Sequence, residues 1–372
     1  YSELMKFGCN IQYIDVGGGL GIDYDGSRST FASSTNYSVQ EYANDVVYHL
    51  LEICKAEDLP HPNIISESGR AMTAHHSILV VNVLDVTSFP EWSEQIEISG
   101  DAPEVVKEIF DVLDSTSNKN LIESWHDAVH LKDAAQSQFL LGLISLADRA
   151  MTERIYWGIC RKIEKLSSRL KFLPDDIRNL KTKLADKYFC NFSIFQSVPD
   201  SWAIDQVFPV VPLNRLHEEP DRDATLADIT CDSDGRIDTF IGTHRGTENT
   251  LRVHSLEPGE SYSLCIFLTG AYQEILGDLH NLFGDTNTVH VSLKEDGSLN
   301  YEQIIEGEDV ADVLDYVQFS ADELAGRIDG FLIGCVQRGV VTQKEADDFL
   351  SLYKAGLDGY TYLVKPKAIE EG

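Results

Sequence analysis

Two short segments near the start of the chain carry residue types that suit the binding of a phosphorylated ligand. Residues 15–21 (DVGGGLG) follow an apolar stretch and carry few side chains, so backbone N–H groups there can close around an anion. Residues 65–70 (ISESGR) follow a second apolar stretch and place Glu67 beside Gly69 and Arg70. We expect the two segments to lie together and to offer a cation, open backbone and a carboxylate to one ligand.

These groups match the needs of pyridoxal 5′-phosphate, whose phosphate requires donors and a cation and whose pyridine nitrogen requires a carboxylate. Each segment also has a simpler interpretation. The glycines alone are compatible with a tight turn, and Glu67 with Arg70 can form a surface ion pair worth about 1 kcal/mol or less. The order of the segments and the motifs that follow favour the cofactor site.

Three further positions could contribute polar groups. In residues 230–235 (TCDSDG), the acids beside Cys231 favour a protonated thiol and hence a proton donor, although Asp and Ser side chains also stabilise turns. Tyr272 follows a buried apolar stretch, so its hydroxyl could reach a phosphate oxygen or could belong to a core aromatic side chain. Asp205 follows another apolar stretch and is a candidate for holding a cationic group of a substrate.

The elements that must position these residues alternate between strand and helix. Residues 11–16 predict a buried strand, residues 39–57 a helix, and residues 63–66 a second strand. Strand, helix, strand with polar groups at the strand ends is typical of a β/α barrel or a doubly wound sheet. Only about two such units are present, whereas a complete barrel has eight.

The rest of the chain predicts three further parts, so the expected fold class is α/β plus β. Strand-forming residues 77–88 lead out of the first part, and the helical stretches after them predict an inserted bundle. Short strands, one of them over 202–213, then predict a sandwich or barrel. Helical periodicity returns at 309–316, 322–338 and 343–357. The expected helices of the bundle are 103–114, 120–132, 135–168 and 175–188. The expected parts are 1–90 (barrel portion), 91–187 (bundle), 188–304 (β domain) and 305–372 (C-terminal helical domain).

Composition limits the classes of partner. A net charge of −31 over 372 residues provides no basic surface for nucleic acid, whereas a small cationic substrate suits an acidic field. The seven cysteines include no CxxC pair, so they suggest neither a zinc site nor disulfides, and reduced thiols predict a cytoplasmic protein. No apolar run reaches transmembrane length, so we expect no membrane partner.

Several motifs, taken in order, resemble those of the fold-type III pyridoxal-phosphate decarboxylases, and most closely the biosynthetic arginine decarboxylases. The resemblance covers nearly the whole chain, and an inserted helical bundle is typical of that branch. The motifs are 14–24 (IDVGGGLGIDY), 67–76 (ESGRAMTAHH), 191–197 (NFSIFQS), 228–235 (DITCDSDG), 270–277 (GAYQEILG), 279–285 (LHNLFGD) and 359–363 (GYTYL).

The resemblance implies an enzyme that decarboxylates L-arginine to agmatine and CO₂ through an imine with pyridoxal phosphate, the first step of a route to putrescine and spermidine. It implies that residues 1–90 are the C-terminal part of a pyridoxal-phosphate-binding (β/α)₈ barrel. Glu67 would pair with the pyridine nitrogen, and Cys231 would protonate the substrate carbon. Members of the family are also commonly assigned Mg²⁺, for which the sequence identifies no ligand. The phosphate would be held by Gly17, Gly18, Gly19, Gly69, Arg70 and Tyr272.

The resemblance also implies how the substrate and a second subunit take part. Asp205 would face the substrate guanidinium, and Asp232 with Cys231 would reach across a dimer interface into the partner's site. A homo-oligomer with shared active sites is therefore implied. The stretch similar to the family's substrate-binding segment consists of Gln12, Tyr13, Ile14, Asp15, Val16, Gly17, Gly18, Gly19, Leu20, Gly21 and Ile22.

One part of the family pattern is missing from these residues. The family's Schiff-base lysine lies on an early barrel strand, and no lysine here occupies that motif. We therefore expect the chain to be a C-terminal fragment of a longer enzyme that is inactive alone. Two alternatives stay open: a decarboxylase of lysine, ornithine or diaminopimelate, and a non-catalytic regulator with the same fold.

Overall fold

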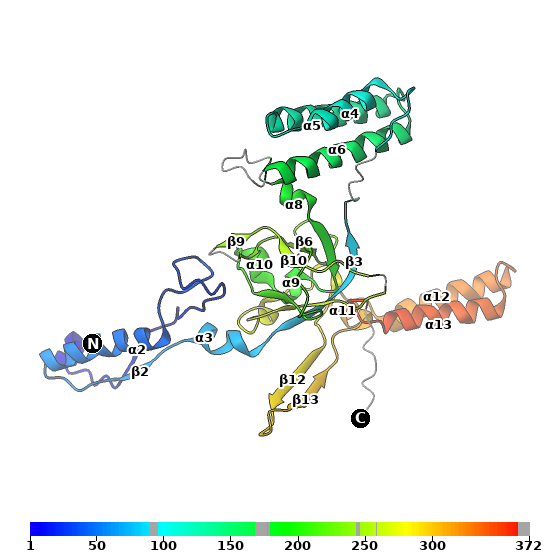
Figure 1. The fold of residues 1–372 in the computed structure, drawn as a ribbon. Helices are drawn as coiled ribbons and strands as arrows, with labels where there is room; N and C mark the ends of the chain where they lie inside the picture. Colours follow the sequence, from blue (N-terminus) through cyan, green and yellow to red (C-terminus); the bar gives the residue numbers. More distant parts are fainter. Residues whose placement is uncertain (90–95, 168–176, 178, 243–245, 258, 364–372) are drawn as a thin grey trace.

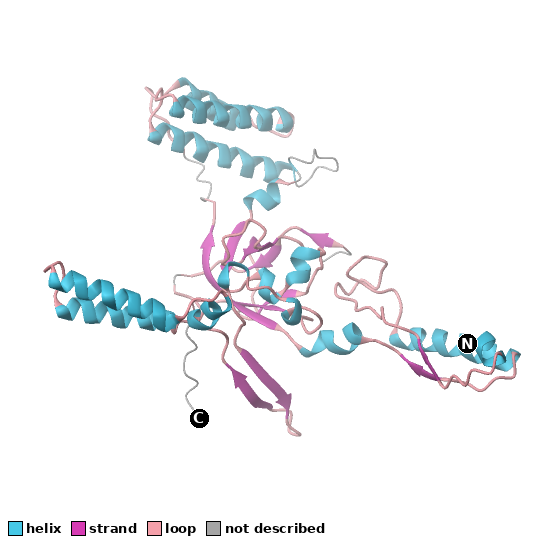
Figure 2. Ribbon diagram, turned by 180° about the vertical axis from the view of Figure 1, so that it is seen from behind, coloured by secondary structure: helices cyan, strands magenta, loops and turns pink. Residues whose placement is uncertain are grey.

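The computed structural model describes residues 1–89, 96–167, 177, 179–242, 246–257 and 259–363 of the chain. A β-sheet lies at the centre, and the other parts extend from it in different directions (Figure 1). Seen from behind, the helical bundle and the C-terminal pair of helices both project away from the central strands (Figure 2).

The N-terminal part is a βαβ unit whose two strands run parallel. The register places Asp15 opposite Ile65, so both strands end at the same edge. The expected helix and the two expected strands are confirmed. In chain order the elements are α1 (Ser2–Lys6), β1 (Tyr13–Asp15), α2 (Val39–Ala56), β2 (Asn63–Ile65), α3 (Gly69–Thr73) and the 3₁₀ turn η1 (Ala74–His76).

Local sequence explains the start of α2, whereas the expected burial of β1 is wrong. Helix α2 begins at a capping box, in which Ser38 and Glu41 each accept a hydrogen bond from the other's backbone N–H. Tyr13 in β1 is 59% exposed. The reason is that β1 and β2 pair only with each other among the described residues, so no further strand covers them.

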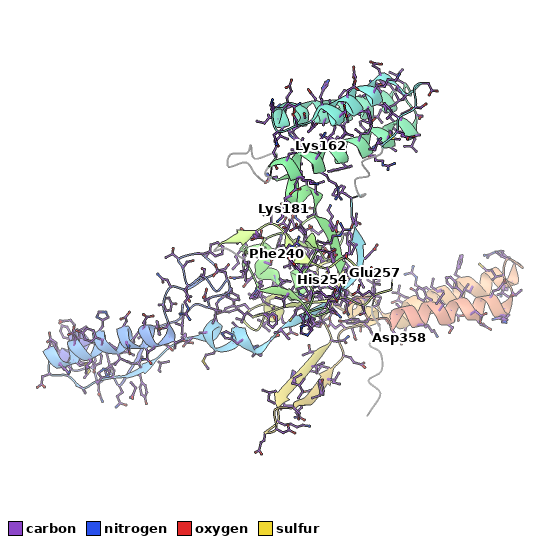
Figure 3. All side chains as sticks on the ribbon, viewed as in Figure 1. Lys162, Lys181, Phe240, His254, Glu257 and Asp358 are labelled. Atoms are coloured by element: carbon purple, nitrogen blue, oxygen red, sulfur yellow. The ribbon has the colours of Figure 1, made fainter. Side chains whose placement is uncertain are left out.

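A seven-stranded mixed sheet forms the central part. Its order is β10-β6-β4-β3-β11-β5, with β7 beside β6, and β4 and β6 are its parallel neighbours. The core of this part is closely packed. The buried Tyr188 donates a hydrogen bond to the backbone carbonyl of His254. Figure 3 labels His254 within the region of the sheet. The strands are β3 (Leu79–Thr87), β4 (Asp186–Cys190), β5 (Val210–Pro212), β6 (Arg222–Ala227), β7 (Arg236–Ile237), β10 (Leu251–Val253) and β11 (Ser263–Ile266), and a separate pair is β8 (Phe240–Ile241) and β9 (Thr247–Glu248).

The sheet uses strands from both sides of the boundary expected at residue 90, because β3 pairs with both β4 and β11. The sequence left a sandwich or a barrel open, and the structure shows one mixed sheet. A strand was expected over 202–213, but its first part is wrong. Helix α10 (Pro199–Ala203) begins there instead, since Pro199 stands in the first helical turn, where its missing N–H leaves no bond unmade.

The inserted bundle consists of long helices packed on an apolar core that includes Ile109, Ile155 and Ile159. The break expected near residues 132–135 is wrong, because α5 continues through them and the chain turns only at 141–145. An apolar face was expected over residues 139–147. Ile144 does lie in the core, but the leucines of that stretch, Leu140, Leu143 and Leu146, are exposed instead. The helix start expected at 174–176 lies outside the described residues. The helices are α4 (Glu104–Ser115), α5 (Leu121–Leu140), α6 (Leu146–Ser167) and the short α8 (Leu180–Leu184).

The C-terminal part holds a β-hairpin and three helices, and the expected helices are confirmed to within a residue or so. Helices α11 and α13 begin at capping boxes whose N-cap residues are Asp309 and Thr342. These local signals explain why the helix starts could be predicted from the sequence. Among the described residues, no helix is long and apolar enough to cross a bilayer. The elements are β12 (Thr288–Leu293), β13 (Leu299–Ile305), α11 (Val310–Tyr316), α12 (Ala321–Gln337) and α13 (Gln343–Leu357).

Candidate active site

Four segments that are distant in sequence line one cavity of about 560 Å³. They are the loop after β1, the turn from β2 into α3, the helix α10 with its following loop, and the loop after β11. Many of the residues expected at a cofactor site lie here. The lining residues are Gly19, Leu20, Gly21, Ile22, Tyr24, Ala32, Ser34, Glu67, Gly69, Arg70, Asp200, Ile204, Gln206, Tyr272 and Leu276.

The parallel pairing of β1 and β2 brings the two motif segments together. Beyond the strands, the Glu67 N–H donates to the Gly17 carbonyl at 2.9 Å. A Cβ at Gly18 would lie 2.9 Å from the Glu67 carbonyl oxygen, so a side chain there would force the segments apart. Gly17 and Gly19 both have positive φ, near 76° and 88°, which glycine adopts readily. The glycines therefore keep Glu67 beside an open stretch of backbone.

Arg70 is the cation of the cavity, and three side chains hold it. Its Nη1 donates to the Tyr24 hydroxyl at 2.9 Å, and its Nη2 lies 3.7 Å from Oδ2 of Asp200. Its guanidinium carbon lies 4.9 Å from the centre of the Tyr272 ring. The guanidinium is thus fixed in place and still only partly covered.

Tyr272 stands in a loop that is packed tightly against α3. The Gly270 N–H donates to the Ala74 carbonyl at 3.1 Å, and a Cβ at Gly270 would lie 2.0 Å from the Thr73 carbonyl oxygen. Tyr272 itself has φ of 70°, a left-handed conformation uncommon for a bulky residue. The packing of the loop therefore holds Tyr272 in a left-handed backbone conformation, in which its side chain lines the cavity.

Tyr24 and Asp200 are partners of Arg70 that sequence reasoning missed as site residues. Tyr24 stands in the IDVGGGLGIDY motif, and it is buried against Phe208 with ring centres 5.5 Å apart. Burial raises the pKa of Tyr24, although the neighbouring Arg70 opposes this rise, so the hydroxyl stays protonated. Asp200 carries no motif, and only its place after the helix-starting Pro199 marks it in the sequence.

Several expected substrate residues lie outside the cavity lining. Gln12, Tyr13, Ile14, Asp15 and Val16 are not among the lining residues, nor are Gly17 and Gly18, which shape the turn beneath it. Asp15 has a local partner, because its Oδ1 accepts a hydrogen bond from the Gly17 N–H at 2.8 Å. Asp205 also lies outside the lining, although its neighbours Ile204 and Gln206 both face the cavity.

Cys231 and Asp232 also lie outside the cavity lining, in an exposed loop. Oδ2 of Asp232 lies 3.1 Å from Nε2 of His280, whose ring packs on Phe195 with centres 4.4 Å apart. His280 was not singled out beyond its motif. The loop after β11 connects the two regions, because it carries Tyr272 at one end and His280 further along.

The loop at 230–235 is organised by a buried carboxylate, Asp228. Its Oδ1 accepts hydrogen bonds from the N–H and the hydroxyl of Thr230, and its Oδ2 accepts from the Ile194 N–H. A Cβ at Gly235 would lie 2.2 Å from Oδ1, so the loop closes only over a glycine. Burial raises the pKa of Asp228, and these hydrogen bonds oppose the rise.

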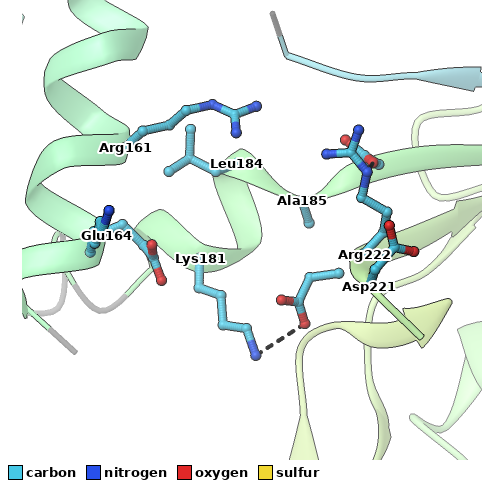
Figure 4. Close-up of a pocket in the computed structure, with 10 residues that line it drawn as sticks. Arg161, Glu164, Lys181, Leu184, Ala185, Asp221 and Arg222 are labelled. Atoms are coloured by element: carbon cyan, nitrogen blue, oxygen red, sulfur yellow. Dashed lines mark ion pairs between the residues drawn. The ribbon is translucent and has the colours of Figure 1, made fainter. Parts of the chain in front are cut away.

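A second cavity, of about 330 Å³, lies between the bundle and the sheet and has a different character. Charged side chains of both signs line it, including the ion pair between Lys181 and Asp223 at 3.1 Å (Figure 4). None of the expected site residues lies there. Over the described part of the chain, no group of three or more His, Cys, Asp or Glu side chains is arranged to hold a metal ion, so the Mg²⁺ implied by the resemblance acquires no ligands.

Three family models match parts of the chain. The model described as "pyridoxal-dependent decarboxylase, pyridoxal binding domain" matches residues 1–74. The "arginine decarboxylase helical bundle domain" matches 99–181, and the "arginine decarboxylase C-terminal helical extension" matches 310–363. The matched ranges follow the βαβ unit, the bundle and the final helices.

Individual relatives match over nearly the whole chain. The biosynthetic arginine decarboxylases of Bacteroides thetaiotaomicron and Phocaeicola vulgatus are 52% and 49% identical over 98% of it. The chain spans 58% of the length of each of these relatives. The crystal structure of the biosynthetic arginine decarboxylase SpeA from Campylobacter jejuni matches with a TM-score of 0.79 at 32% identity, over 96% of this chain and 57% of that one.

Proposed function

The chain belongs to the biosynthetic arginine decarboxylase family, and we propose that it serves the conversion of L-arginine to agmatine and CO₂ with pyridoxal phosphate as cofactor. The observation that carries this proposal is the meeting of Glu67, Arg70 and Tyr272 around one cavity. These groups come from separate segments, and each has the chemistry that a different part of the cofactor needs.

The donor set at one side of the cavity fits a phosphate group. Arg70 supplies a guanidinium that can donate two hydrogen bonds, and Tyr272 supplies a hydroxyl. Gly19 and Gly69 line the same cavity without side chains, so a phosphate can approach their backbone. We propose that these residues, with Gly17 and Gly18 shaping the turn, hold the cofactor phosphate.

Glu67 is the acidic group of the turn into α3, and we propose that it faces the pyridine nitrogen. When bound, pyridoxal phosphate supplies an electron-accepting ring to the carbon that loses CO₂. The carboxylate of Glu67 would keep a proton on the ring nitrogen, which preserves that electron demand. Its hydrogen-bonded backbone, fixed against Gly17, orients the side chain for this role.

The basic substrate requires negative charge near the cavity. Asp205 lies between two lining residues, and its φ of 55° turns the chain sharply there. We propose that it holds the substrate guanidinium, aided by residues 12–22 and by the acidic field of a chain with net charge −31.

Cys231 is exposed, Asp232 is half-buried beside His280, and both lie apart from the cavity lining of their own chain. This arrangement supports the proposal that they complete the site of a second subunit in a homo-oligomer. There, the Cys231 thiol would give its proton to the substrate carbon after CO₂ has left, and the carboxylate of Asp232 would help to bind the cationic group of the substrate.

The test is product analysis with the purified protein, the barrel portion that carries the family's Schiff-base lysine, and pyridoxal phosphate. Arginine, lysine, ornithine and diaminopimelate are offered separately, and the released amine and CO₂ are quantified. Agmatine formed from arginine alone is the expected result. Release of cadaverine or putrescine would change the substrate class, and absence of any product with the lysine-bearing barrel portion present would favour a regulator.

A further inference from the structure

A buried pair of side chains connects the two proposed phosphate ligands, Arg70 and Tyr272. We propose that this pair, Asp200 and Gln273, consists of positioning residues that set the geometry of the phosphate site. The inference rests on the proposed function, because it assumes that Arg70 and Tyr272 bind the cofactor phosphate. The pair itself would not touch the phosphate and would act through its neighbours.

Asp200 and Gln273 bind each other at two points. The Gln273 side-chain Nε2 donates to Oδ2 of Asp200 at 2.8 Å, and its Oε1 accepts from the Asp200 backbone N–H at 3.2 Å. Both side chains are almost fully covered, with exposures of 8% and 1%. A buried amide that is satisfied at both ends has one orientation, so the pair fixes α10 against the loop after β11.

Gln273 also controls the backbone on which Tyr272 stands. Its Nε2 makes a second hydrogen bond, to the Ala271 carbonyl at 2.9 Å. Tyr272 lies between these two residues in the left-handed region, which a tyrosine adopts only when the surroundings impose it. The bonds on both sides of Tyr272 supply that constraint, and they direct its ring toward Arg70.

Asp200 orients the other ligand. The oxygen that accepts from Gln273 is the same Oδ2 that lies 3.7 Å from Nη2 of Arg70. The guanidinium is anchored on its other side by the Tyr24 hydroxyl, so its plane is set by two fixed partners. Because Gln273 holds the carboxylate, a change at Gln273 reaches Arg70 through Asp200 and reaches Tyr272 directly.

The experiment compares two ligands that differ only in the phosphate. Pyridoxine 5′-phosphate and pyridoxine have no aldehyde, so neither can form an imine with a lysine, and calorimetry gives their dissociation constants. Gln273→Met removes the amide and keeps the length of the side chain. We expect it to weaken pyridoxine 5′-phosphate about tenfold, the effect of misplacing a hydrogen bond to a charged group, and to leave pyridoxine unchanged.

Two further variants keep the test decisive. Gln273→Glu conserves volume and sets a carboxylate against that of Asp200, so it should give the same selective loss if Gln273→Met folds poorly. Gln343→Met is the matched control, because Gln343 also donates to an aspartate, Asp347, at 2.8 Å on the surface of α13. The control should leave both dissociation constants unchanged.

Each outcome decides the matter. Equal weakening of both ligands by the Gln273 variants would show a merely structural role, and no weakening would remove the role altogether; either result overturns the inference and leaves the proposed function standing. If the unaltered protein binds pyridoxine 5′-phosphate no more tightly than pyridoxine, the proposed phosphate site is itself wrong and the inference falls with it.

Discussion

The cavity and the loop at 230–235 are each organised by one buried aspartate, but the two aspartates have different partners. Asp200 faces a guanidinium and a side-chain amide, so its charge is directed at a group that lines the cavity. Asp228 accepts hydrogen bonds from backbone N–H groups and one hydroxyl, so its carboxylate holds closed the loop that carries Cys231. The first arrangement prepares a binding site, and the second prepares a protruding reactive group.

We infer from this difference that cofactor binding and proton delivery belong to separate regions of the chain. Changes around the cavity should alter cofactor affinity, whereas changes in the loop should alter the chemical step or the stability of the fold.

Replacing Cys231 by Ala should reduce kcat by roughly 10²–10⁴-fold, the usual contribution of a positioned proton donor. The affinity for pyridoxine 5′-phosphate should not change, because the proposed phosphate ligands Arg70 and Tyr272 are intact and the thiol would face the substrate carbon. Steady-state kinetics and calorimetry measure the two quantities. Cys9→Ala is the control, since Cys9 is likewise exposed. An equal loss of affinity and turnover would contradict the division.

Replacing Arg70 by Met should weaken pyridoxine 5′-phosphate by about 10- to 100-fold, since a hydrogen bond to a charged group contributes about 1.5–3 kcal/mol. Affinity for pyridoxine should stay unchanged. The matched control is Arg149→Met in the bundle, because Arg149 also pairs with a carboxylate, that of Glu153 at 3.2 Å, and lies over an aromatic ring. Unchanged affinity in the Arg70 variant would remove the phosphate site from this cavity.

Replacing Asp228 by Asn should lower the free energy of unfolding by about 1–3 kcal/mol, because an amide NH₂ cannot accept the hydrogen bond from the Ile194 N–H. Chemical denaturation measures this loss, and cofactor affinity should be unaffected. A matched surface change is Asp296→Asn, whose carboxylate also accepts from a backbone N–H, that of Ser298. If both variants lose the same stability, the loop does not depend on its buried carboxylate.

The smallest effect concerns pH and Asp285, in the segment that also carries His280. Burial raises the pKa of Asp285, and the nearby charge of Glu308 raises it further. The folded state therefore holds this proton more tightly than the unfolded state, and stability falls as the pH rises from 3.8 through the folded-state value. In Asp285→Asn this decline should be absent, so the stability difference from the unaltered protein should change across that window. A constant difference would contradict the assignment.

Local signals made much of the fold predictable. The helices at 39–56, 310–316 and 343–357 begin at side chains that cap the first turn, and such capping is encoded within four residues. The break expected near residues 132–135 was misplaced because no glycine or proline interrupts α5 there, and the helix ends instead just before Gly142, where φ is 71°.

The site was predictable only where short motifs carry it. Glu67 and Arg70 flank Ser68 and Gly69, and Cys231 stands in an acidic turn, so their residue types attract attention directly. Tyr24 and Gln273 stand inside two of the motifs and Asp200 stands in none, but the role of each depends on a partner far along the chain. The contact between Gln273 and Asp200 joins residues 73 positions apart, which no local rule anticipates.

A crystal structure of the protein with pyridoxine 5′-phosphate bound tests the proposed phosphate site most directly. We expect the phosphate within hydrogen-bonding distance of the Arg70 guanidinium and the Tyr272 hydroxyl, with the ring nitrogen facing Glu67 and the contact between Asp200 and Gln273 intact. A phosphate bound elsewhere, with the cavity filled only by solvent, would contradict the assignment of the phosphate site.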